Sequence, residues 1–155
     1  NHRGLSDYLS AAAAGGDAVP VPLDEILRPT EVEGLQILPA GPVPKNPVSL
    51  LKSAAFDALV AELRRRADYV FVDAPPVNVV VDPMVMAGRL EGTLLVVAAG
   101  ETDKDQITQA KRLLETARAR LIGCVLNKVT IPSRGYYYYY YYRYYYDKYR
   151  YYREA

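Results

Sequence analysis

The chain has 155 residues, a formal net charge of +1 and a single cysteine, and half of its residues are hydrophobic. This length suits one domain with its own core. The nearly balanced charge argues against bulk nucleic-acid binding by the body of the chain. One cysteine excludes an intrachain disulfide and fits a reducing cytoplasm. No stretch approaches the roughly 20 apolar residues that span a bilayer, and no signal peptide is visible. The first residue is Asn rather than Met, so we expect a piece of a longer protein.

The first forty residues predict short helices and one short strand. Apolar helical segments at residues 5–9 and 23–27 flank the run 11–16, which we expect to be flexible. Residues 34–39 form a short apolar run typical of a strand, and a loop with two prolines follows it. These pieces predict no catalytic group by themselves.

A longer helix is expected from Asn46 to the three arginines at positions 64–66. Asn46 suits the N-cap, and Pro47 suits the first turn, where no backbone donor is needed. Positive charge favours a helix C-terminus, so we interpret the arginines as a solvated helix end. Four apolar residues at four-residue spacing predict the buried face: Leu51, Ala55, Leu59 and Leu63.

Three continuous apolar runs follow, at residues 69–73, 92–98 and 121–127. Runs without alternation are typical of strands that are buried on both faces in a parallel sheet. The second and third runs are separated by a helix, for which Thr102 and Asp105 predict a capping-box-like start. Its apolar stripe is Ile107, Ala110, Leu114 and Ala117. The pattern predicts an α/β fold with a mainly parallel sheet flanked by helices.

Ligands of open α/β sheets bind beyond the carboxyl ends of the strands. Three polar groups are expected there: Asp73, residues 100–102, and Asn127 with Lys128. A carboxylate that ends a buried strand needs a partner, so Asp73 is either a Mg²⁺ ligand or a cap of the next turn. Glu101 and Thr102 are expected in a loop and at a helix start. Cys124 lies within an apolar run and is expected to be a buried small hydrophobe.

The segment YVFVDAPPV, residues 69–77, resembles the Walker B segment of the bacterial tyrosine kinases, cytoplasmic autokinases that regulate capsule and exopolysaccharide export. Segments 4–9, 38–42, 92–100 and 123–128 are similar to the family's motifs and come in its order. All but two of the 15 tyrosines follow Gly135, and a tyrosine-rich C-terminus is the family's other hallmark. The resemblance implies the deviant-Walker P-loop NTPase fold.

The resemblance also implies roles for individual residues. Asp73 matches the catalytic Walker B aspartate, which helps to hold Mg²⁺ and to organise the γ-phosphate of ATP. Asn127 matches the asparagine that contacts adenine. Ala74 departs from the family's frequent threonine but leaves the aspartate in place. The tail tyrosines match the cluster that neighbouring subunits phosphorylate in trans. These phosphoacceptors are Tyr136, Tyr137, Tyr138, Tyr139, Tyr140, Tyr141, Tyr142, Tyr144, Tyr145, Tyr146, Tyr149, Tyr151 and Tyr152.

One family motif is absent from the sequence. No G-x-x-x-x-G-K-[ST] phosphate loop occurs in the 155 residues, and we expect it upstream of Asn1. We therefore expect residues 1–132 to be the C-terminal portion of a kinase domain that lacks its N-terminal P-loop portion, and residues 133–155 to be a disordered tyrosine-rich tail. Because the loop's amides and lysine cradle the phosphates, we expect no appreciable kinase activity from this chain alone.

The tail suggests how phosphorylation regulates assembly. From Ser133 onward five basic side chains face two acidic ones, and each phosphotyrosine adds about −1.5 to −2 charges. Two or three phosphates therefore reverse the sign of the tail. An unmodified basic tail is expected to lie in a neighbour's anionic ATP cleft, and a phosphorylated tail is expected to leave it and loosen a ring of subunits.

The resemblance further implies partners and a location. We expect neighbouring copies of the chain, a membrane-anchored polysaccharide co-polymerase region or partner protein, and a tyrosine phosphatase, at the cytoplasmic face of the bacterial plasma membrane. No nucleic-acid partner is expected.

Three alternatives stay open. The chain is also compatible with a deviant-Walker ATPase of the partitioning type, although such proteins have no use for a tyrosine tail. Tyrosine interleaved with arginine is compatible with stacking on single-stranded nucleic acid. A polytyrosine run without proline also has the composition of a self-associating segment.

Overall fold

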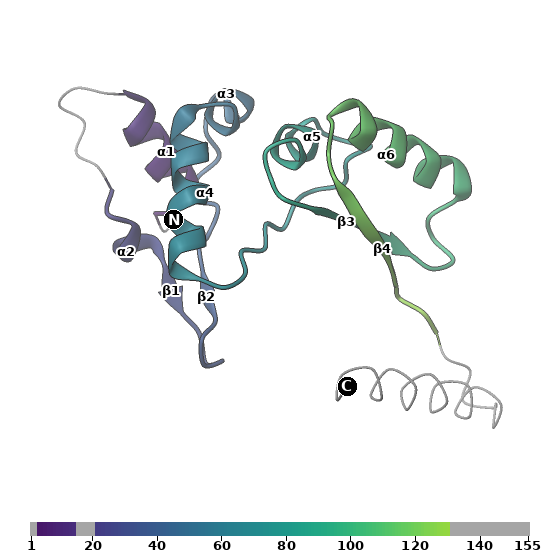
Figure 1. Ribbon diagram of the computed structural model, residues 1–155, viewed down its shortest axis with the longest axis horizontal. Helices are drawn as coiled ribbons and strands as arrows, with labels where there is room; N and C mark the ends of the chain where they lie inside the picture. Colours follow the sequence, from purple (N-terminus) through teal and green to yellow (C-terminus); the bar gives the residue numbers. More distant parts are fainter. Residues whose placement is uncertain (1–2, 15–20, 131–155) are drawn as a thin grey trace.

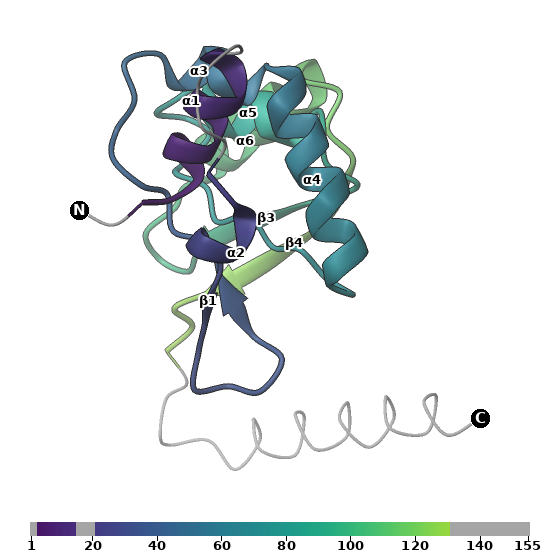
Figure 2. The ribbon, with the colours of Figure 1, turned by 90° about the vertical axis from the view of Figure 1, so that its left-hand side faces the viewer.

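The computed structural model describes residues 3–14 and 21–130. An N-terminal lobe, residues 3–66, is connected to a C-terminal lobe, residues 82–130, by the linker 67–81 (Figure 1), and in Figure 2 the N-terminal lobe faces the viewer. The elements of the N-terminal lobe are α1 (Leu5–Ala14), α2 (Leu23–Ile26), β1 (Arg28–Pro29), β2 (Gln36–Ile37), α3 (Pro47–Leu51) and α4 (Ala54–Arg66). Those of the C-terminal lobe are α5 (Asp82–Ala87), β3 (Thr93–Ala98), α6 (Lys104–Thr116) and β4 (Leu121–Asn127).

The C-terminal lobe contains a strand–helix–strand unit. β3 and β4 are parallel, in a register that runs from Thr93 beside Leu121 to Ala98 beside Asn127, and α6 is the crossover between them. Ala110 and Leu114 are the buried residues of α6, as the apolar stripe predicted. The predicted α/β class with parallel strands and flanking helices is confirmed.

The predicted strand at residues 69–73 is wrong. In the part of the chain that the structure describes, this run is extended but pairs with no other strand, because β3 pairs only with β4. Tyr69 and Phe71 are exposed. The physical reason is that an apolar run becomes a strand only when a neighbouring strand takes up its backbone hydrogen bonds.

The N-terminal lobe holds the main core. α1 runs through Ala14, so the expectation of a flexible run from residue 11 is wrong for residues 11–14, where consecutive alanines favour helix. The short run at 34–39 contributes only β2, which forms an antiparallel hairpin with β1. The buried cluster consists of Leu9, Leu23, Ile26, Leu51, Phe56 and Leu59, together with Met86 from α5.

The single helix predicted from Asn46 onward is two helices, α3 and α4. The chain turns at Lys52 and Ser53, where the Ser53 hydroxyl donates to the Leu50 carbonyl (2.6 Å). A serine that bonds to the backbone in this way competes with continuous helix. Asn46 occupies the N-cap position of α3, but its side chain makes no capping hydrogen bond.

The start of α1 is tied to the loop after β2. The Leu5 backbone N–H donates to the Pro39 carbonyl (2.8 Å), and that of Ser6 donates to the Ala40 carbonyl (2.9 Å). Gly41 lies against this helix start with a φ of +79°, and a Cβ there would lie 2.5 Å from the Ser6 hydroxyl. The loop therefore supplies acceptors for amides that a helix leaves unpaired at its N-terminus.

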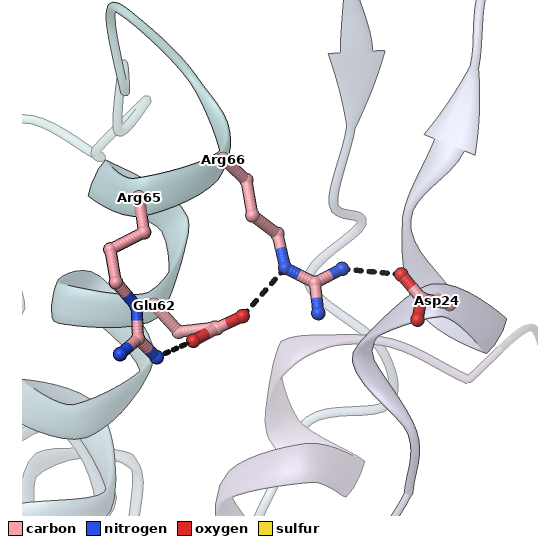
Figure 3. Close-up of polar contacts among 4 residues, drawn as sticks. All are labelled: Asp24, Glu62, Arg65 and Arg66. Atoms are coloured by element: carbon pink, nitrogen blue, oxygen red, sulfur yellow. Dashed lines mark hydrogen bonds and ion pairs between the residues drawn. The ribbon is translucent and has the colours of Figure 1, made fainter.

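The three arginines at the end of α4 are exposed, as expected for a solvated helix end, and each of them also forms an ion pair. Arg66 bridges Glu62 in its own helix and Asp24 in α2, while Arg65 also contacts Glu62 (Figure 3). Arg64 pairs with Glu91 across to the C-terminal lobe (2.5 Å). These contacts connect α4 to segments that lie far from it in sequence.

Candidate functional site

The candidate site lies at the carboxyl ends of β3 and β4. Ala98 is the register partner of Asn127, and the Ala99 backbone N–H donates to the Asn127 carbonyl (2.9 Å). Immediately afterwards Gly100 turns the chain with a φ of +75°, a conformation that glycine adopts without steric penalty. The Thr102 hydroxyl then accepts from the Ala98 backbone N–H (3.2 Å). The loop after β3 is thus fastened to the end of its own strand.

The Asn127 side chain is held by the residue that follows it. Its Oδ1 accepts from the Lys128 backbone N–H (2.8 Å), and Lys128 adopts a φ of +56°. This contact uses the acceptor atom of the carboxamide and leaves the two Nδ2 hydrogens as donors. A donor in this position suits a ring nitrogen of a base such as adenine.

An ion pair joins the two loops. Lys128 Nζ contacts the Glu101 carboxylate at 2.7 and 3.0 Å, and both side chains are more than half exposed. The prediction that residues 100–102 and Asn127–Lys128 share one edge of the sheet is confirmed. The specific pairing was missed at sequence level, although opposite charges after two neighbouring parallel strands are the signal that could have indicated it.

Asp73 is not brought into this group. It is exposed, and in residues 3–14 and 21–130 it makes no hydrogen bond or ion pair; no set of three His, Cys, Asp or Glu residues there could hold a metal. The linker is anchored five residues later, where Asn78 Nδ2 donates to the Gln106 carbonyl of α6 (3.0 Å). A single accessible carboxylate still fits Mg²⁺, which takes one or two carboxylates together with water and phosphate oxygens.

The start of α6 differs from the prediction by one residue. Asp103, not Thr102, is the N-cap, and its carboxylate accepts from the Gln106 backbone N–H (2.8 Å). The Gln106 side chain accepts in return from the Asp103 N–H (3.3 Å), which completes a capping box. Asp105 therefore has no capping role.

Two further expectations concern cysteine and tyrosine. Cys124 is exposed, so its predicted burial is wrong: no part of the described chain covers that side of β4. The thirteen tail tyrosines lie outside the described residues, as does the predicted tail 133–155.

Among the helices at 3–14 and 21–130, none combines the length and apolar character that crossing a bilayer requires.

The chain is similar in sequence to known tyrosine-protein kinases. No family model matches the chain. It is 34% identical over 128 residues to the tyrosine-protein kinase CpsD of Streptococcus agalactiae serotype Ia, covering 83% of this chain and 52% of that kinase. It is 36% identical over 137 residues to the putative tyrosine-protein kinase CapB of Staphylococcus aureus, covering 88% and 57%.

Solved structures agree with these relatives. The chimerical protein CapA2B2 superimposes with a TM-score of 0.74 at 32% identity, covering 84% of this chain and 54% of that one. The kinase domain of the Escherichia coli tyrosine kinase ETK superimposes with a TM-score of 0.72 at 27% identity, covering 88% and 52%. The chain thus spans about half the length of the proteins that it matches.

Proposed function

Because this chain belongs to the bacterial tyrosine kinases, we propose that it is the C-terminal part of a kinase domain that transfers the γ-phosphoryl group of ATP to tyrosines of its own tail. The observation that carries the proposal is the joined pair of loops after β3 and β4, where the Glu101–Lys128 ion pair lies beside the fixed Asn127 side chain. This arrangement comes together with a tail that holds 13 tyrosines. A partitioning-type ATPase has no use for such a tail.

In the proposed kinase, Asn127 Nδ2 donates to adenine and fixes the base at the sheet edge. The Asp73 carboxylate would hold Mg²⁺, which would neutralise charge on the phosphates. Asp73 is accessible and has no protein partner in the described ranges, so its carboxylate oxygens are available for this role. These assignments follow from the resemblance to the bacterial tyrosine kinases, and the exposure of both side chains is compatible with them.

The phosphoacceptors in this proposal are the 13 tyrosines between residues 136 and 152, which reach the site of a neighbouring copy in a ring. Phosphates reverse the positive charge of the tail, so a modified tail leaves an anionic cleft. We place this cycle in capsule or exopolysaccharide export at the cytoplasmic face of the plasma membrane, with a membrane-anchored co-polymerase and a tyrosine phosphatase as partners.

The test is intact-mass analysis and phosphopeptide mapping of the full-length protein purified from its own cells. We expect several phosphates on residues 136–152 in the wild type and none in Asp73→Ala. The matched control is Asp68→Ala, which removes an exposed carboxylate five residues earlier and should leave the phosphates in place. An unmodified tail in the wild type would refute the kinase proposal and favour tail self-association.

A second measurement concerns the 155-residue chain alone. We expect the purified chain to label its tail by less than about one part in a hundred of the full-length protein when incubated with Mg·ATP, because it has no phosphate loop to orient the phosphates. Tail labelling at the full-length rate would show that the loop is dispensable.

A further inference from the structure

Lys128 has an unusual backbone conformation. Among the described residues other than glycine, only Lys128 and Arg118 have a positive φ, which is 56° in both. Arg118 follows the end of α6, and helices commonly end on a residue in this left-handed conformation. Lys128 instead follows β4 directly. A residue with a Cβ adopts this conformation at a cost in free energy, so other contacts must hold it there.

Two contacts hold Lys128. Its backbone N–H donates to Asn127 Oδ1 (2.8 Å), and its Nζ contacts both carboxylate oxygens of Glu101 (2.7 and 3.0 Å). The first contact orients the carboxamide of Asn127. The second ties Lys128 to the loop after β3, 27 residues earlier in the chain, and so restricts the conformations that are open to Lys128.

The loop that carries Glu101 is itself fastened. The Glu101 and Thr102 backbone N–H groups both donate to the Ala98 carbonyl (3.3 and 3.0 Å), and the Thr102 hydroxyl accepts from the Ala98 N–H (3.2 Å). Ala98 is the last residue of β3 and the register partner of Asn127. The Glu101 carboxylate therefore belongs to a loop that is anchored to the sheet edge on which Asn127 lies.

We propose that Glu101 is a positioning residue for the nucleobase and that it acts through Lys128. The ion pair holds Lys128 in its left-handed conformation, and the Lys128 N–H then keeps Asn127 Oδ1 occupied. Both Nδ2 hydrogens of Asn127 stay available as donors to the base. This inference rests on the proposed function, in which Asn127 donates to adenine, and it assigns the ion pair to binding of the base and not of the phosphates.

A direct contact between the Lys128 ammonium and the phosphates is a poorer interpretation. Both oxygens of Glu101 lie within hydrogen-bond distance of Nζ, so a carboxylate already neutralises this charge. A phosphate at Nζ would have to displace Glu101 or be repelled by it. The two interpretations predict opposite signs: removal of the Glu101 charge should strengthen nucleotide binding if Lys128 binds phosphate, and should weaken it if Glu101 positions Asn127.

The test is titration of the full-length protein with mant-ADP, a fluorescent ADP, in the presence of Mg²⁺. Glu101→Gln should raise the Kd about threefold, because an exposed ion pair contributes little by itself. Glu101→Lys should raise it about tenfold, because two ammonium groups then repel each other. Combining Glu101→Lys with Lys128→Glu re-forms the pair in the opposite sense and should restore the Kd to within about twofold of the wild type.

The matched control is Glu115→Lys, which changes the net charge by the same amount as Glu101→Lys. Glu115 pairs with Lys111 on α6 (3.6 Å). The lysine and glutamate of this pair are 60% and 59% exposed, against 57% and 59% for Lys128 and Glu101. Because this pair lies away from Asn127 in sequence and makes no contact with it in the described residues, the Kd should change by less than about 1.5-fold.

A ligand without a base separates positioning from a general structural role. Inorganic triphosphate should displace mant-ADP with an inhibition constant that Glu101→Gln and Glu101→Lys leave within about twofold of the wild-type value. If Glu101 merely maintained the fold of the site, both variants would weaken triphosphate and mant-ADP together. The expected result is thus a loss of affinity that is confined to the ligand with a base.

Four results would overturn the inference. They are tighter binding of mant-ADP by Glu101→Gln, an equal loss of affinity for mant-ADP and triphosphate, failure of the exchanged pair to restore the Kd, and a wild-type protein that does not bind mant-ADP. A Kd that depends on Glu101 as expected, together with an unphosphorylated tail, would refute only the kinase proposal. A phosphorylated tail together with the same Kd in all variants would refute only this inference.

Discussion

The two lobes contain similar apolar residues but bury them to different extents. In the N-terminal lobe Leu9, Ile26 and Leu59 are at most 1% exposed, whereas in the C-terminal lobe Val96 and Leu126 are about 60% exposed. The helices of the N-terminal lobe satisfy their own backbone hydrogen bonds and need only side-chain contacts to form a core. A sheet needs neighbouring strands as well as covering helices. The described chain completes its helical packing but not its sheet.

The largest change in the free energy of unfolding should come from replacing a leucine of the core. We expect Leu59→Ala to lower the free energy of unfolding by about 3 kcal/mol, because it removes a fully buried side chain and leaves a cavity. The matched change in the sheet, Val96→Ala, should alter it by less than about 0.5 kcal/mol. Urea unfolding followed by circular dichroism measures both. Equal losses would mean that the face of β3 is already covered in solution.

A smaller effect is expected at the contact between α1 and its loop. Gly41→Ala should destabilise the chain by about 2 kcal/mol, because a positive φ strains alanine and the new Cβ meets the Ser6 hydroxyl. Gly34→Ala is the control, since Gly34 has almost the same φ (+77°) but nothing within 4 Å of the added Cβ. Its loss should be about 1 kcal/mol. Thermal unfolding of the pair isolates the steric contact from backbone strain.

The smallest change in stability is expected at the N-cap of α6, in the C-terminal lobe. Asp103→Ala removes the N-cap of α6 and should lower the free energy of unfolding by about 1 kcal/mol. Asp105→Ala, in the same first turn but without a capping bond, should lower it by about 0.3 kcal/mol. If chemical denaturation gives the reverse order, the capping box starts one residue earlier, as the sequence pattern indicated.

The predictions from sequence succeeded where the information is local. Apolar runs and a helical stripe identified β3, α6 and β4, and they placed Asn127 and residues 100–102 at one edge of the sheet. The same local reasoning failed for residues 69–73, whose composition is that of a buried strand. Composition states what a segment can become once a partner is present, but it does not supply the partner.

Sequence alone indicated the family through the order of its motifs, and it determined the helix periodicity and the segments that form β3 and β4, because periodicity and apolar runs depend on residues that are near one another in the chain. Only the tertiary structure decided the break at Ser53, the bridge from Arg66 to Asp24, and the pairing of Glu101 with Lys128. In the described residues it also left Asp73 without a hydrogen bond or ion pair to the groups around Asn127. The break at Ser53 is a local competition that the apolar spacing does not decide. The two ion pairs join residues 42 and 27 positions apart, and no local pattern specifies which remote group will be in reach.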